Sequence, residues 1–146
     1  MELEIRRPLP RISPVNRHFW EMAADGLLGL PWCEKCEATH FPPSPRCPHC
    51  LHDVFEWRAA SGRAKLVSWV IFHRAYWDGV ALEVPYNVCQ VELEEGPRFI
   101  SNLVGEAARE PRYQMPLQVC FTDAYPDLVL PVFDVPANAC PSHHSQ

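Results

Sequence analysis

Lysine is scarce in this chain, and a long apolar run is missing. Only Lys35 and Lys65 stand against eleven arginines, and the formal net charge of the 146 residues is -5. A nucleic-acid-binding protein normally carries a basic surplus, so this charge balance argues against DNA or RNA as the partner. No apolar stretch approaches the roughly 20 residues that a membrane-spanning helix needs, which argues against a membrane protein.

The common catalytic and nucleotide-binding motifs are missing too. The sequence contains no G-x-S-x-G, H-E-x-x-H, phosphate-loop or G-x-G-x-x-G pattern. The paired carboxylates Glu94 and Glu95 fall in a predicted turn, where a solvated surface explains them better than acid–base chemistry. We therefore predict no catalytic residue and expect a chain that is not an enzyme on its own.

Cysteine usage indicates the compartment. The N-terminus lacks the apolar segment of a signal peptide. The number of cysteines, seven, is odd, and four of them form two C-x-x-C pairs. In a chain without a secretion signal such pairs indicate metal binding rather than disulfides, so we expect a reducing, cytoplasmic location.

The two pairs are Cys33 with Cys36 and Cys47 with Cys50, and ten residues separate them. Each C-x-x-C turn supplies two thiolates, and two turns complete a tetrahedral shell. Because a closed shell leaves no open coordination position, we predict one structural Zn²⁺ ion per chain. Four thiolates can also hold one iron, so a rubredoxin-like electron carrier stays open as an alternative function.

Glycine is absent from two positions where zinc-binding turns often have it. Glu37 and Leu51 follow the second cysteine of each pair. A side chain in the left-handed conformation favoured there costs roughly 1–2 kcal/mol. Metal binding contributes about 10 kcal/mol or more in small zinc modules, so we expect the ion to prevail.

The chain divides into four predicted parts. We expect an N-terminal arm and amphipathic helix over residues 1–30, a zinc ribbon over 31–58, a β-barrel over 59–137 and a tail over 138–146. Ser13 and Pro14 predict the start of the helix. Phe19 and Trp20 lie on its apolar face, and either internal packing or contact with a partner protein would bury them.

Five strand-like runs follow the ribbon. In the second run Cys89, Val91 and Leu93 alternate with polar residues, as in a half-buried strand. A long first run followed by four more favours an OB-like barrel, so the predicted fold is mainly β, with an N-terminal helix, a rubredoxin-like zinc ribbon and a five-stranded OB-fold barrel. The runs cover residues 64–77, 86–94, 98–104, 117–124 and 128–135.

A series of different short motifs follows one order along most of the chain. They are Phe19-Trp20-Glu21, Phe41-Pro42-Pro43, Cys47-Pro48-His49-Cys50, Ser61-Gly62-Arg63-Ala64, Asn102-Leu103-Val104-Gly105 and Leu130-Pro131-Val132-Phe133. This series resembles the domain of unknown function 35 family of zinc-ribbon OB-fold proteins. The resemblance implies a non-catalytic subunit of a hetero-oligomer, which associates with a thiolase-like or aldolase enzyme and binds acyl-CoA in lipid, steroid or aromatic acid metabolism.

An acyl-CoA site needs cations for phosphates and a flat surface for adenine. The first long strand and its neighbours offer such side chains, although the aromatic ones would serve equally well as core or rim residues. Binding of single-stranded nucleic acid is the second alternative function, because OB barrels stack bases on aromatic side chains. The candidates for acyl-CoA contact are His73, Arg74, Trp77, Tyr86, Arg98 and Asn102.

Overall fold

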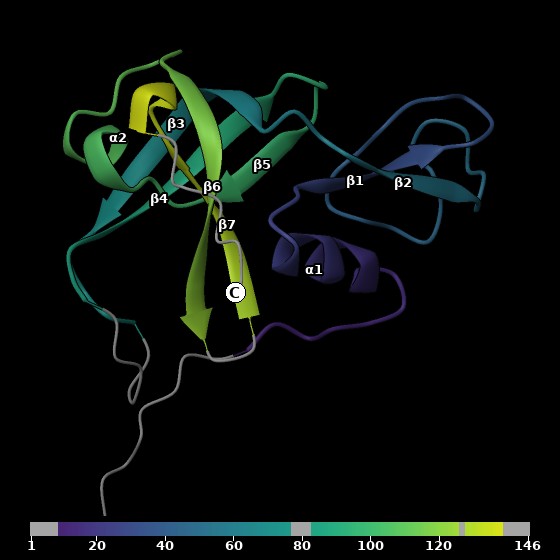
Figure 1. Cartoon of the computed structure of the whole chain (residues 1–146), viewed down its shortest axis with the longest axis horizontal. Coiled ribbons are helices and arrows are strands. Elements are labelled where there is room, and N and C mark those ends of the chain that lie inside the picture. The colour runs from purple at the N-terminus through teal and green to yellow at the C-terminus, as the bar shows by residue number, and fades with distance from the viewer. Residues whose placement is uncertain (1–8, 77–82, 126–127, 139–146) are drawn as a thin grey trace, which may run out of the picture.

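The computed structural model describes residues 9–76, 83–125 and 128–138. Two antiparallel sheets organise them, as Figure 1 shows. The smaller sheet pairs β1 (Gly29–Cys33) with β2 (Phe55–Ala59). No helix in the described ranges is long and apolar enough to cross a lipid bilayer.

The larger sheet has the strand order β5-β4-β3-β6-β7 and curls into a barrel. Its ends meet where the Phe133 N–H donates to the Asn102 carbonyl at 3.0 Å and the Val104 N–H donates to the Phe133 carbonyl at 2.9 Å. This nearly closed five-stranded sheet confirms the predicted mainly-β fold. Its strands are β3 (Arg63–Phe72), β4 (Tyr86–Leu93), β5 (Arg98–Ser101), β6 (Pro116–Tyr125) and β7 (Leu128–Asp134).

Alternation of apolar and polar residues fixes which face of β3 and β4 points inward. Leu66 lies opposite Val91 in the register, and both are fully buried. Lys65 lies opposite Glu92, and both are exposed. A slip of one residue would exchange the two faces, so burial of the apolar set specifies this pairing.

The helix α1 (Arg17–Ala24) begins later than the sequence predicts. Ser13 opens a turn instead, because its carbonyl accepts hydrogen bonds from the N–H groups of Asn16 and Arg17. The Asn16 side chain accepts from the Ser13 N–H at 2.8 Å and donates to the Arg11 carbonyl at 3.1 Å. The predicted helix start at Ser13 and Pro14 is therefore wrong, and Asn16 is the N-terminal cap residue.

An aromatic junction joins the helix, the ribbon and the barrel. The Phe99 ring of β5 lies 4.5 Å from the Phe41 ring of the ribbon and 6.1 Å from the Phe19 ring of α1, measured between centroids. A third neighbour, Phe133 of β7, lies at 6.1 Å. Figure 1 shows α1 between the two sheets, and this junction gives all three parts one continuous core.

A short helix, α2 (Gly105–Arg109), links β5 to β6 and depends on a buried carboxylate. Asp134, which is 5% exposed, accepts a hydrogen bond from the Ala107 N–H at 3.1 Å and another from the Val135 N–H at 2.7 Å. Gly105 has φ 57°, and a Cβ there would overlap with the Asp134 carboxylate. Asp134 thus supplies the cap that α2 lacks in its own sequence. A single 3-10 turn, η1 (Pro136–Asn138), follows β7.

Candidate metal centre and ligand-binding surface

The four predicted metal ligands converge on one point at the end of the small sheet. Cys33 ends β1, and its Sγ lies 3.5 Å from Sγ of Cys50. The Sγ atoms of Cys36 and Cys47 lie 3.6 Å apart, and all four sulfurs fall within 4.8 Å of one another. A tetrahedral zinc ion with bonds of about 2.3 Å requires sulfur–sulfur distances of roughly 3.8 Å. The four thiols therefore fit one zinc ion.

The two C-x-x-C turns share one hydrogen-bond pattern. The Glu37 N–H donates to the Cys33 carbonyl at 2.9 Å, and the Leu51 N–H donates to the Cys47 carbonyl at 2.8 Å. Glu37 and Leu51 have φ values of 58° and 65°, in the left-handed region. Both turns keep the geometry that glycine would favour, and each accepts the strain of a side chain there.

Ionisation of the four thiols is linked through their proximity. Burial raises the pKa of Cys33, but the N–H groups of Cys36 and Lys35, together with the thiols of Cys50 and Cys36, outweigh it and lower that pKa to about 6. The Ala38 N–H lowers the pKa of Cys36. Desolvation and the neighbouring thiols outweigh this effect and together raise that pKa to about 12. One thiolate thus suppresses ionisation of the next, and a divalent cation relieves that repulsion.

A buried histidine supports the ribbon next to the metal centre. His40 is 7% exposed, and its ring meets Phe55 edge-on at 5.3 Å. Its Nε2 lies 3.2 Å from Ser44 Oγ, whose proton is directed to the Arg46 carbonyl, so Nε2 is the donor. The Nδ1 atom has no hydrogen-bond partner within the described part of the chain. Burial lowers the pKa of His40, which keeps this imidazole neutral.

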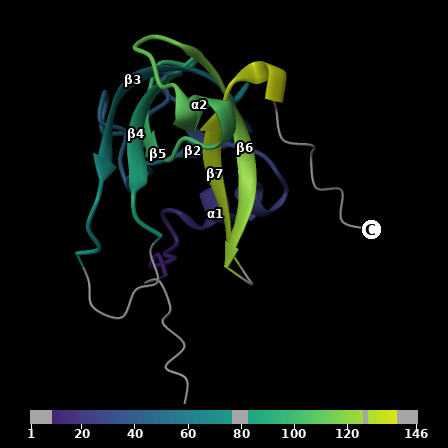
Figure 2. The same ribbon diagram turned by 90° about the vertical axis from the view of Figure 1, so that its left-hand side faces the viewer.

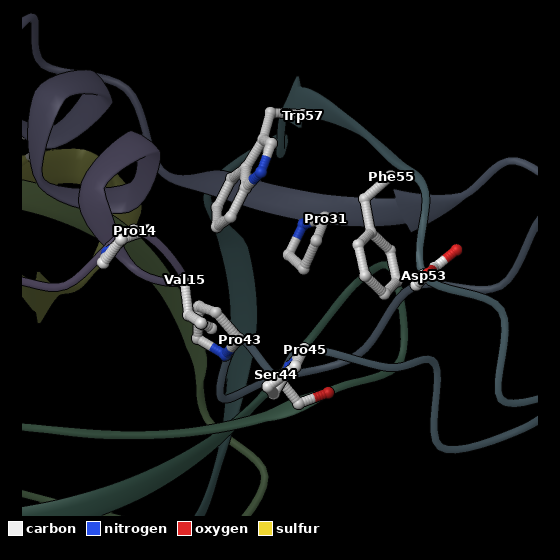
Figure 3. Close-up of a pocket in the computed structure, with 9 residues that line it drawn as sticks. All are labelled: Pro14, Val15, Pro31, Pro43, Ser44, Pro45, Asp53, Phe55 and Trp57. Atoms are coloured by element: carbon white, nitrogen blue, oxygen red, sulfur yellow. The ribbon is translucent and has the colours of Figure 1, made fainter.

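A pocket of about 210 Å³ lies between the ribbon and the start of α1. Figure 3 shows Phe55 and Trp57 projecting from the same side of β2 above a floor rich in proline. Asp53 is the one charged residue in the lining, and it carries the wrong sign for a phosphate. This pocket suits an apolar group and does not suit the phosphates of CoA. Its lining is Pro14, Val15, Pro31, Pro43, Ser44, Pro45, Asp53, Phe55 and Trp57.

Part of the predicted acyl-CoA set gathers on the outer face of the barrel. Tyr86 stacks on Phe72 with ring centroids 5.1 Å apart and planes at 17°. Tyr76 meets Phe72 edge-on at 5.8 Å, and it is 62% exposed. His73 and Arg74 stand between Phe72 and Tyr76 in the sequence, and both are exposed. Here an aromatic platform lies beside positively charged or titratable side chains.

The other candidates do not all join this platform. Arg98 lies opposite Glu92, six positions along β4 from Tyr86, which is roughly 20 Å in a strand. The Asn102 side-chain amide donates one of its two N–H groups to the backbone carbonyl of Asn87, so that hydrogen is already used within the chain. Arg98 and Tyr86 are too far apart to contact the same small group. Trp77 falls outside the described residues.

The predicted partner contacts, Phe19 and Trp20, are mostly inside the molecule. Phe19 is 5% exposed within the aromatic junction, and Trp20 packs edge-on against it at 5.0 Å. The sequence left open whether internal packing or contact with a partner protein buries these side chains. In this chain, internal packing buries Phe19. The Trp20 indole Nε1 is buried and has no hydrogen-bond partner among the residues described.

Comparisons with known proteins agree with this architecture. Residues 20–56 match the family model of the ChsH2 rubredoxin-like zinc ribbon domain, and residues 57–122 match that of the ChsH2 C-terminal OB-fold domain. A DUF35 domain-containing scaffold protein from Pyrococcus furiosus is 32% identical over 111 residues, which cover 75% of this chain and 76% of that protein. The chain belongs to the DUF35 family. Its metal site is the zinc site of a zinc ribbon, with four cysteines in place to bind the ion.

A longer curated relative of this DUF35 chain has a different name. A probable enoyl-CoA hydratase alpha subunit from Thermomonospora curvata is 37% identical over 129 residues. The match covers 87% of the DUF35 chain but 39% of that relative. The DUF35 chain therefore spans well under half of the relative's length.

Two solved structures resemble the DUF35 chain. One, described as the Ltp2-ChsH2(DUF35) aldolase, matches with a TM-score of 0.78 and 35% identity, covering 86% of this chain and 97% of that one. The other is a DUF35 protein of unknown function from Sulfolobus solfataricus, with a TM-score of 0.60 over 84% and 87% of the two chains. At 14% identity, the second match supports the fold alone.

Sequence reasoning missed the pocket and the small sheet that carries it. Phe55 and Trp57 alternate with Glu56 and Arg58 along β2, and this alternation was a usable signal for a strand. The five prolines of the ribbon segment, Pro31, Pro42, Pro43, Pro45 and Pro48, concealed that signal, because proline is uncommon inside strands.

Proposed function

We propose that this DUF35 chain is a zinc-containing, non-catalytic subunit that associates with a thiolase-like or aldolase enzyme and contributes to binding its acyl-CoA substrate. The observation that carries the proposal is the 35% identity to a chain of the Ltp2-ChsH2(DUF35) aldolase, with 97% of that chain covered. Relatives named as a scaffold protein and as an enzyme subunit support the same role.

The zinc site suits a structural role in such a subunit. Four cysteine ligands complete a tetrahedron and leave no position for water or substrate. An ion bound in this way stabilises the ribbon and does not polarise a carbonyl. The chemistry of the complex would then belong to the enzyme partner.

The outer platform of Phe72, Tyr76 and Tyr86 is the proposed contact surface for acyl-CoA. The stacked pair Phe72 and Tyr86 offers a flat apolar surface for adenine. Arg74, which is exposed next to it, offers a guanidinium group for a phosphate. Arg98 lies near the other end of β4 and would contact a different part of the ligand or none.

Association is tested with the purified full-length chain and purified thiolase-like or aldolase enzymes. We expect one stable complex in size-exclusion chromatography with light scattering, and enzyme turnover that depends on the complex. Turnover of an acyl-CoA thioester by this chain alone would contradict the proposal. So would the absence of binding to every such enzyme tested.

Acyl-CoA contact is tested by titrating the complex with acetyl-CoA and a longer acyl-CoA in a calorimeter. We expect Arg74→Ala to raise the Kd about tenfold through loss of a charge-assisted phosphate contact. Arg112→Ala is the matched control, because Arg112 is also exposed but lies in the loop before β6. Equal Kd values for the wild-type and Arg74→Ala complexes would remove this platform from the proposal.

A further inference from the structure

The second half of β3 is an open edge of the barrel. From Ser68 to Phe72 this strand pairs with β4 on one side in unbroken register. Its pairing with β6 on the other side ends at Lys65, and Leu66 bonds to the loop at Gln114 and Met115. Beyond Leu66, no described strand pairs with this edge. In Figure 2 the lower part of β3 lies at the outer margin of the sheet.

This edge lacks the features that usually prevent strands from pairing between molecules. Natural edge strands carry lysine, proline or inward-pointing charges. In the same barrel β6 begins with Pro116, and β7 contains Pro131. The segment Val67–Phe72 contains no proline and no charged residue.

Apolar side chains are exposed on both faces of this edge. Val70 lies opposite Val88 on the outer face and is 52% exposed. Ile71 lies opposite Asn87 on the inner face, yet it is 49% exposed. An inner-face residue of a covered barrel would be buried, so the mouth of the barrel is open here.

We propose that an extended, uncharged segment of the enzyme partner adds to the barrel as a strand beside Val67–Phe72. Unpaired backbone N–H and C=O groups along an edge are satisfied by another strand, which determines the backbone conformation of the occupant. The absence of charge along the edge indicates that the occupant is uncharged too. A charged side chain of the occupant would be desolvated against Val70 and Ile71 without an opposite charge nearby. This inference rests on the proposed association with an enzyme subunit and adds the place and mode of contact.

The new strand would extend the sheet next to the aromatic platform. Phe72 ends β3 and also stacks on Tyr86. A partner segment along β3 would therefore bring the enzyme directly beside the proposed acyl-CoA contact. The platform and the docking edge would share Phe72 at their boundary.

Lysine substitutions at the edge test the proposal in the purified complex. Val70→Lys and Ile71→Lys should each raise the Kd for the enzyme subunit about tenfold, because lysine blocks edge pairing. Ile100→Lys is the matched control, since Ile100 is 66% exposed on β5, away from this edge. It should change the Kd less than about twofold. Folding of each variant is checked by its thermal unfolding and zinc content.

Hydrogen exchange gives a second readout that needs no variant. Amides in residues 67–72 of the wild-type chain should exchange at least about tenfold more slowly in the complex than in the free chain. A complex that forms without added protection there, or that Ile100→Lys weakens as much as Val70→Lys, would overturn the docking edge and leave the proposed function standing. Protection that depends on the concentration of the chain alone would assign the edge to a second copy and also overturn it. Failure of the wild-type chain to bind any such enzyme would overturn both proposals.

Discussion

Glu37 and Leu51 occupy equivalent places in the two halves of the metal site. Each residue follows the second cysteine of a C-x-x-C pair, has a positive φ and donates its N–H to the carbonyl of the first cysteine, four residues earlier. Further N–H groups repeat the pattern, from Cys33 to the Ala38 carbonyl and from Cys47 to the His52 carbonyl. The ribbon thus presents two copies of one turn to the ion, and each copy carries a side chain in a conformation that favours glycine.

Replacing Leu51 by glycine should stabilise the zinc-loaded chain. Leu51 is 68% exposed, so little apolar burial is lost. Relief of the left-handed strain, offset by the greater freedom of glycine in the unfolded chain, leaves a gain of about 0.5–1 kcal/mol in the free energy of unfolding. Urea denaturation measures this gain. Leu51→Ala keeps the Cβ and should show no gain, and an equal gain in both variants would contradict the explanation.

Removal of zinc should unfold the ribbon. The purified chain should contain one zinc ion, measured by metal analysis, and a strong chelator should remove it with loss of ordered structure. Cys47→Ser should lose the metal because Cys47 supplies one of the four sulfurs. Cys89→Ser is the control, since Cys89 is also buried but lies in β4. A variant Cys47→Ser that retains a full equivalent of zinc would argue against the four-thiolate site.

Asp134→Ala should destabilise the fold by about 1–3 kcal/mol, because it leaves the N–H groups of Ala107 and Val135 without their buried acceptor. Asp134→Asn keeps one acceptor oxygen and should cost less. The exposed residue Asp123 provides the control, and Asp123→Ala should stay within about 0.5 kcal/mol of the wild type. Denaturant unfolding compares the three variants, and a neutral result for Asp134→Ala would exclude its capping role.

Stability should fall in mild acid through His40. Burial lowers the pKa of His40 in the folded chain below its ordinary value of 6.5. As the pH falls through that ordinary value, the unfolded chain takes up a proton that the folded chain does not, so the free energy of unfolding decreases. His40→Gln removes this contribution, and the variant should lose less stability than the wild type between about pH 7.5 and pH 5.5.

Urea unfolding of the wild type and of His40→Gln at the two pH values measures this difference. The acid sensitivity of the zinc site is common to both proteins, so it cancels in the comparison. Identical pH profiles for His40→Gln and the wild type would show that His40 is not the group responsible.

The barrel strands were predictable from sequence because local alternation determines them. Cys89, Val91 and Leu93 mark the inner face of β4 without any knowledge of its neighbours. The metal ligands were predictable for the same reason, since each pair lies within one short turn.

What the sequence did not reveal depends on contacts between distant residues. The helix α2 needs a cap from Asp134, 27 residues beyond Ala107. The spread of the acyl-CoA candidates follows from strand register, because Arg98 lies opposite Glu92 and not opposite Tyr86. Neither relationship leaves a trace in local composition.

The aromatic junction has a consequence for how this molecule comes apart. Phe19, Phe41 and Phe99 belong to three segments that family boundaries and domain predictions divide, yet their rings share one interior. Dividing the chain near residue 57 would expose to water the apolar surface that each fragment now buries against the other. Neither fragment should therefore fold as an independent module. Ribbon, helix and barrel should instead melt in a single cooperative transition.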